Sequence, residues 1–211
     1  MRSDFLNARK LKANSGAQPA KFMSPRTVVY RALAMLLSFL PVIGATVCMG
    51  AELLPGQHLP MLKGQFLTGR AAVLPEAASG RAALLALGFT YDSRFAVGAW
   101  VKKFREDFGD NPQVTFYEIP MIGGMAQMGK WFIDSGMRRG TPKADHERVI
   151  TVYGGTGPWK ERLGFKAVEA AFLILLDKNG IVHWRYNGLF DEAAYKSLYA
   201  DMKALLANST D

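Results

Sequence analysis

The chain has 211 residues, of which 49% are apolar and 11% are aromatic. It can therefore bury a core of ordinary size, and it is too short for two large domains. Its formal net charge of +8 would suit nucleic acid or an anionic membrane surface. Residues 1–51, however, hold seven basic residues against one acid, whereas residues 52–211 hold nineteen against seventeen. The larger part of the chain is nearly neutral, so we expect no nucleic acid partner.

A run of twenty residues without charge, residues 32–51, follows the basic N-terminal region. Basic residues, then an apolar run, then the small residue Ala51 form the layout of a signal peptide. The run also has the length of a membrane-spanning helix, although Pro41 and Gly44 interrupt it. We therefore expect residues 1–51 to be a signal peptide or a membrane anchor.

This leader also predicts where the protein is found. A start at Met23 would give a leader of conventional length, and residues 52–211 would form one domain. We expect that domain to be exported to the periplasm, or to be held at the membrane by residues 32–51 if they are not cleaved. The alternative is a mitochondrial presequence followed by a membrane segment, which would place the protein at the mitochondrial inner membrane.

The single cysteine of the chain, Cys48, lies inside the apolar run. Residues 52–211 therefore have no thiol for a structural disulfide or for thiol–disulfide exchange. The stability of this part must come from its core, and redox chemistry that depends on cysteine is excluded from it.

Apolar patterning predicts the elements of the domain in chain order. Residues 52–75 are punctuated by glycine and proline, and we expect an irregular leading segment there. Apolar or alternating runs predict five strands, over residues 81–90, 113–120, 148–153, 170–176 and 181–186. Helical spacing of apolar residues predicts helices over residues 93–108, 125–137 and 192–206, with one short helical turn over residues 159–163. Residues 177–180 (Asp-Lys-Asn-Gly) predict a tight turn between the last two strands.

The order of these elements predicts the fold class. Strands separated by helices imply right-handed crossovers and a parallel half-sheet, to which the final hairpin adds antiparallel strands. This is the α/β thioredoxin-like sandwich, a mixed central sheet flanked by helices that ends in an antiparallel hairpin and a C-terminal helix. Its reactive site follows the first core strand, at the positive end of the next helix. In this chain the corresponding stretch, residues 88–95, holds no cysteine, and residues 166–172 lack the proline that this fold has before its hairpin.

Three stretches, in chain order, resemble the ATP10 family of ATP synthase assembly factors. They are ALLALGFTYDSRFAVGAWVKKF, then HERVITVYGG with ERLGF, then AFLILLDKNGIVHWRYNGLFDEAAYKSL. The likeness covers about residues 65–206 and departs from the family pattern at Thr90, at Lys102 and Lys103, and at Arg185. It implies a thioredoxin-like fold and a chaperone role for a hydrophobic membrane protein, with a membrane subunit of the ATP synthase as the client.

Met121, Met125 and Met128 flank a Gly-Gly pair in the sequence, with the candidate Trp131 in the helix that follows, and they allow three interpretations. They could pack a helix onto the sheet, or their flexible thioethers could contact an apolar client. Thioethers also bind Cu(I), but no cysteine or histidine is adjacent to them in sequence. We predict no metal site and no cofactor.

Two further clusters are candidates for partner contact. Asp92, Ser93 and Arg94 stand at the expected reactive corner, where a helix cap with an ion pair is the alternative interpretation. His146 and Arg148 follow a basic loop, where a solvated strand edge is the alternative. Neither cluster has a nucleophile motif, so we predict no catalytic residue.

The sequence thus favours a non-redox binding protein or assembly factor. The rivals are an exported thioredoxin-fold enzyme without a thiol nucleophile, which would use Asp92, Ser93 or His146, and a metal-binding protein that relies on the methionines.

Overall fold

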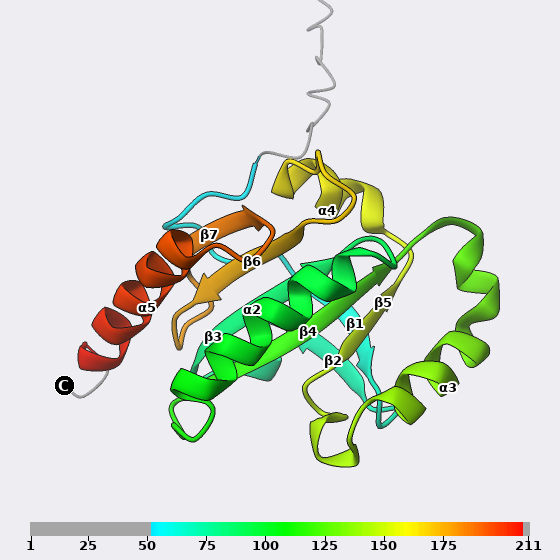
Figure 1. The fold of residues 1–211 in the computed structure, drawn as a ribbon, viewed down its shortest axis with the longest axis horizontal. Helices are drawn as coiled ribbons and strands as arrows, with labels where there is room; N and C mark the ends of the chain where they lie inside the picture. Colours follow the sequence, from blue (N-terminus) through cyan, green and yellow to red (C-terminus); the bar gives the residue numbers. More distant parts are fainter. Residues whose placement is uncertain (1–51, 209–211) are drawn as a thin grey trace, which may run out of the picture. The chain divides into compact units, whose positions relative to one another are not determined.

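The computed structural model describes residues 52–208, so the expected leader or anchor in residues 1–51 lies outside the described residues. Strands and helices alternate through most of this region (Figure 1). The elements are β1 (Leu62–Phe66), β2 (Ala71–Leu74), η2 (Glu76–Ala78), β3 (Ala82–Gly88), α2 (Ser93–Phe108), β4 (Val114–Ile122), η3 (Gly124–Gly129), α3 (Lys130–Gly140), η4 (Lys143–Asp145), β5 (Ile150–Tyr153), α4 (Thr156–Leu163), β6 (Ala171–Leu176), β7 (Val182–Gly188) and α5 (Glu192–Ala207).

The strands form one mixed sheet in the order β2-β1-β5-β4-β3-β6-β7. β3, β4 and β5 are parallel, and β6 and β7 continue the sheet in antiparallel pairing beyond β3. We call the end of the sheet where β3, β4 and β5 finish the carboxyl edge, and the opposite end the amino edge. Loops that follow parallel strands meet at the carboxyl edge, where ligand sites of α/β sheets usually lie.

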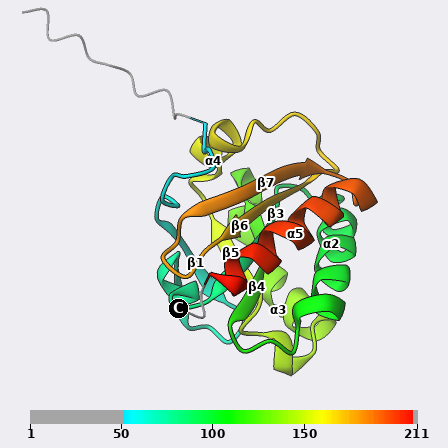
Figure 2. The same ribbon diagram turned by 90° about the vertical axis from the view of Figure 1, so that its left-hand side faces the viewer.

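Each face of the sheet has its own core. In β3 the side chains of Leu84 and Ala86 pack with α2 and α5, whereas Leu85 and Leu87 point to the other face. Figure 2 shows α5 crossing the sheet near α2. The second face is covered by α4, the β1–β2 hairpin and the segment that begins at Leu53. Because both faces of β3 are buried, a continuous apolar run encodes it.

The mixed α/β architecture predicted from the sequence is confirmed, but the leading segment is not irregular. β1 and β2 form an antiparallel hairpin there, and β1 also pairs with β5. Gly64 lies in β1 because a Cβ at this position would stand 2.6 Å from the Ile150 methyl carbon Cγ2 and 2.8 Å from the Thr151 carbonyl oxygen. The glycine marks a close approach of two strands rather than a break.

The helix predicted over residues 125–137 starts later than expected. Its first part is the 3₁₀ segment η3, and the α-helix α3 begins only at Lys130. The remaining predicted strands and helices lie where the sequence placed them, within a few residues at their ends.

Candidate functional site

The loop between β3 and α2 turns at the carboxyl edge and is held by two hydroxyl groups. The Thr90 N–H donates to Ser93 Oγ (3.2 Å), and the Ser93 N–H donates to Thr90 Oγ1 (3.1 Å). Ser93 Oγ also donates to the Thr90 carbonyl oxygen (2.8 Å), and the Thr90 hydroxyl donates to the Val168 carbonyl oxygen. This reciprocal pairing satisfies the Ser93 N–H, the first of α2, and fixes the loop before the helix to the loop before β6.

Ser93 is only 1% exposed. Gly88 makes room for it, because a Cβ on Gly88 would stand 2.6 Å from Ser93 Oγ. The hydroxyl is thus buried and engaged in hydrogen bonds to the backbone of Thr90, so it is no free nucleophile. The side chain of Asp92 is exposed and makes no capping bond, so the structure does not support the interpretation of Asp92 as a helix cap.

Arg94 does not form the ion pair that the sequence suggested. Its guanidinium carbon lies 3.4 Å from the ring centre of Tyr91 and 4.1 Å from that of Phe95, and Nη1 donates to the Tyr91 carbonyl oxygen (2.8 Å). Cation–π contact of this kind orders exposed rings. Arg94 therefore holds two aromatic side chains in place at the protein surface.

Four large apolar side chains are exposed at this corner, each between 55% and 78%. They come from the first turn of α2 and from three loops that meet at the carboxyl edge, and we call them the corner surface: Tyr91, Phe95, Val168 and Leu189. Beside them is an open hollow of about 340 Å³ lined by apolar walls and two carboxylates, from Asp92, Phe95, Ala96, Glu169 and Leu189. The geometry suits an apolar segment of a partner with a basic group beside it.

The corner surface was not predicted from the sequence. One signal was present, since Phe95 is two residues before Val97 and so falls on the face of α2 opposite the buried stripe. Val168 and Leu189 carried no such signal, because only the pairing of β3, β6 and β7 brings them near Phe95.

The structure separates the methionine cluster. Met121 is 3% exposed and belongs to the core, as the packing interpretation requires. Met125, Met128 and Trp131 lie on the outside of η3 and α3, together with Phe132, each between 71% and 86% exposed. These four residues do not pack a helix onto the sheet, and we call them the α3 patch.

His146 and Arg148 lie at the amino edge, just before β5. His146 Nε2 is 3.0 Å from the Thr141 carbonyl oxygen, and the Arg148 guanidinium carbon is 4.4 Å from the ring centre of Phe116. Ser93 is at the opposite end of the parallel strands, so the structure does not bring a serine and a histidine together. The arrangement supports neither acyl transfer nor general base catalysis by these candidates.

Within residues 52–208, no group of three histidine or acidic side chains could hold a metal ion. No helix of the same range combines the length and the apolar character that crossing a membrane requires.

Comparison with known proteins shows the fold. No protein-family model matches the chain, and no curated protein matches it. BsSco, a member of the Sco family of cytochrome c oxidase assembly proteins with an identified disulfide switch, superposes with a TM-score of 0.51 at 15% identity, over 75% of this chain and 97% of that chain. A candidate protein disulfide isomerase from Bacteroides thetaiotaomicron superposes with a TM-score of 0.50 at 13% identity, over 75% and 94% of the two chains.

The chain has a thioredoxin-like fold. Its solved neighbours are thiol–disulfide proteins by their descriptions, whereas residues 52–211 of this chain hold no cysteine. Thr90 and Ser93 stand at the spacing of a Cys-x-x-Cys motif, at the N-terminus of α2. The start of α2 in this chain thus presents two hydroxyls and no thiol.

Proposed function

We propose that this protein is a thioredoxin-like binding protein without redox activity, which assists the assembly of a hydrophobic membrane protein. The corner surface would receive an apolar segment of the client. The observation that carries the proposal is the exposure of Tyr91, Phe95, Val168 and Leu189 around one hollow, at the corner where the thiol is missing. Contiguous exposed apolar groups of this kind are typical of interaction sites.

The charges around the hollow indicate what else the client carries. Asp92 and Glu169 line it, while the Arg94 guanidinium is stacked on Tyr91 and Phe95. A lysine or arginine of the client could lay its aliphatic stem on the apolar wall and its charge against the carboxylates. Basic residues next to apolar segments are common at the ends of membrane helices.

The likeness to the ATP10 family makes a membrane subunit of the ATP synthase the first client to test. BsSco, with the same fold, is described as a member of a family that assembles cytochrome c oxidase. The uncharged run over residues 32–51 would export or anchor the domain, in the periplasm or at the mitochondrial inner membrane.

Photo-crosslinking in the native membrane tests the proposal. A photoreactive phenylalanine analogue would replace Phe95 in the full chain, and Tyr199, an exposed aromatic residue on α5, would be its matched control. We expect crosslinks from position 95 to an integral membrane protein, identified by mass spectrometry, and none from position 199. The double variant Tyr91→Ser, Phe95→Ser should reduce crosslinking from a probe at position 189. Position 95 yielding no membrane protein, or the same products as position 199, would contradict the proposal.

A further inference from the structure

The outward side of η3 and α3 is apolar over its first two turns. Met125, Met128 and Phe132 follow the i, i+3, i+7 spacing of one helical stripe, and Trp131 flanks it. A soluble domain normally turns such a stripe toward its core, because burying apolar surface stabilises the fold by about 25 cal/mol per Å². Here the stripe faces away from the sheet, with all four side chains exposed.

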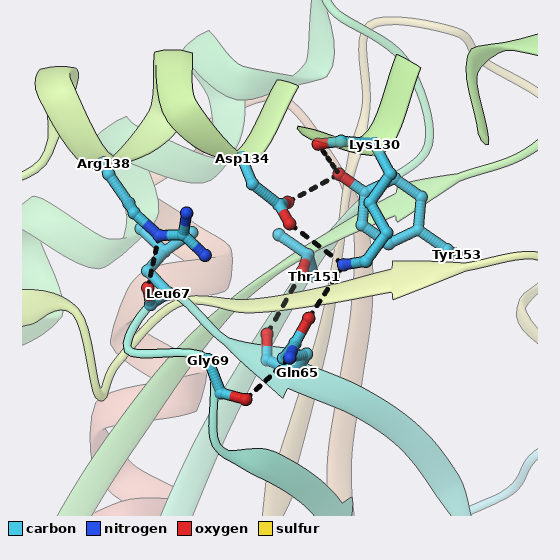
Figure 3. A network of polar contacts seen from close by, with 8 residues as sticks. All are labelled: Gln65, Leu67, Gly69, Lys130, Asp134, Arg138, Thr151 and Tyr153. Carbon is cyan, nitrogen blue, oxygen red and sulfur yellow. Dashed lines mark hydrogen bonds and ion pairs between the residues drawn. The ribbon is translucent and has the colours of Figure 1, made fainter. Parts of the chain in front are cut away.

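The inward side of α3 is polar, and this fixes the orientation of the helix (Figure 3). Lys130 Nζ donates to Gln65 Oε1 on β1 (2.8 Å) and pairs with Asp134 Oδ2 (2.9 Å). The Tyr153 hydroxyl, at the end of β5, donates to Asp134 Oδ1 (2.6 Å). Asp134 is the one buried residue of α3, so a carboxylate with two donors anchors the helix to the sheet.

The same polar face continues one turn further along the helix. Arg138 Nε donates to the Leu67 carbonyl oxygen (2.6 Å). Positions 130, 134 and 138 recur every four residues, and Phe132 is two residues from 130, about 200° around the helix axis. Turning the apolar stripe inward would withdraw the Asp134 carboxylate from its donors. The exposure of the α3 patch is therefore imposed by the fold.

The start of η3, where the patch begins, lies near the first described residues of the chain. Gly123, just before η3, is so near α4 that a Cβ on it would stand 2.6 Å from Thr156 Oγ1. At the other end of α4, the Arg162 carbonyl oxygen accepts a bond from the Leu53 N–H (2.9 Å). The eight residues of α4 span only about 12 Å. The described chain, which directly follows the uncharged run in the sequence, thus begins about one short helix away from η3.

The side-chain chemistry of the α3 patch favours lipid as the partner that covers it. Tryptophan, phenylalanine and methionine beside basic residues are the composition of helices that lie in the membrane interface. Arg139 is exposed in the last turn of α3, on the same side as Phe132 seven residues before it, and the only acid of this helix, Asp134, is turned inward. The exposed charge on the outward side of α3 is therefore positive and complements anionic headgroups.

We infer that the α3 patch docks into the interface of a lipid bilayer with anionic headgroups, so that the carboxyl edge of the sheet faces the membrane. The corner surface lies at the same edge. Together the two surfaces contain eight of the eleven exposed large apolar side chains of the described residues, and the others are Leu54, Met61 and Tyr199. The inference stands independently of the proposed function.

Depth-dependent fluorescence quenching on the full chain tests this inference. A Cys48→Ser background leaves no other thiol, so Phe132→Cys can carry a single bimane label on an exposed position. Tyr199→Cys is the matched control, because Tyr199 packs on Phe108 at the far end of α2 (5.1 Å between ring centres). Both proteins are reconstituted into phosphatidylethanolamine–phosphatidylglycerol vesicles containing lipids with brominated acyl chains, and no other protein is present.

The label at position 132 should be quenched to the degree expected about 5–10 Å below the headgroups, while the label at position 199 should not be quenched. Quenching at position 132 should fall when phosphatidylcholine replaces phosphatidylglycerol. It should remain unchanged in a Phe95→Ser variant, so a failure of the proposed function would not affect the result. If position 132 is as unquenched as position 199, the patch does not contact lipid and a protein partner must cover it instead. Equal quenching in both lipid mixtures would overturn the role of the anionic headgroups.

Discussion

At the scale of single residues, Tyr195 connects the aromatic core to a charged group. Its hydroxyl is 2.7 Å from Asp107 Oδ2, and its ring centre is 6.1 Å from that of Trp100. The hydrogen bond from Tyr195 is the main cause that holds the pKa of Asp107 below its ordinary value, and Lys103 adds to it. A pKa that is lower in the folded than in the unfolded state stabilises the fold above the unfolded pKa, about 3.9, and the gain is lost as the pH falls through the folded pKa.

Replacing Tyr195 by phenylalanine should therefore destabilise the protein in a pH-dependent way. We expect the Tyr195→Phe change to lower the free energy of unfolding by about 1–2 kcal/mol at pH 7, because the Asp107 carboxylate loses its strongest donor. The difference in the free energy of unfolding between the variant and the original protein should become smaller below about pH 4, where the Asp107 carboxyl is protonated in the unfolded state. Urea unfolding at pH 7 and pH 3.5 measures it, with Tyr199→Phe on the exposed side of α5 as a control that should change stability by less than about 0.5 kcal/mol. An equal loss at both pH values would exclude the carboxylate as the cause.

Single residues also show where sequence reasoning stops at the site. The corner could be located from the apolar run before it and the helix after it, and the missing thiol was visible directly. The burial of Ser93 could not be predicted from the sequence, because it depends on the space that Gly88 leaves beside the Ser93 side chain. The role of Arg94 depends on ring positions, which no spacing in the sequence encodes.

At the scale of elements, α3 depends on contacts from distant strands. Asp134 is buried, and its carboxylate takes donors from Lys130 and Tyr153. The pKa of the Tyr153 hydroxyl is raised, chiefly by burial and then by its hydrogen bond to Asp134, so this group stays a donor at neutral pH. The helix is thus held by buried polar contacts rather than by an apolar face, and such contacts are costly to leave incomplete.

The Tyr153→Phe change removes one of these donors and should loosen α3. The loss of one partner from a buried charged group costs about 1–3 kcal/mol. We expect the amide protons of α3 to exchange faster with solvent in this variant, while those of β3 keep the protection of the global fold. Hydrogen exchange followed by mass spectrometry distinguishes the two segments. Uniform faster exchange in both would mean that α3 is not a separately opening unit.

Elements with a continuous apolar run were predictable from the sequence, and those that depend on partners were not. β3 and β6 are buried on both faces, so their sequences alone identify them. β1 contains Lys63 and Gly64, and it forms a strand because it pairs with β2 and β5. The apolar residues of η3 and α3 have helical spacing, yet they face outward because Gln65 and Tyr153, far away in sequence, hold the opposite side.

At the scale of the whole molecule, the domain should be indifferent to redox conditions. Residues 52–211 hold no thiol, so neither fold nor site can change with thiol oxidation. We expect a Cys48→Ser variant of the full chain to unfold at the same denaturant concentration with and without dithiothreitol, and to show no disulfide reductase activity. A shift of the midpoint by reductant would contradict the assignment of a non-redox domain.

The exposure of Met125 and Met128 has a chemical consequence in the presence of oxidants. Cysteine sites with this fold can be driven to sulfinic and sulfonic acids, but the hydroxyls of Thr90 and Ser93 offer no such route. The two methionines are more than four-fifths exposed, and oxidants convert thioethers to polar sulfoxides. Peroxide would therefore leave the corner surface unchanged and make the α3 patch more polar, so that oxidation would weaken the proposed contact with a bilayer before it altered the proposed contact with a client.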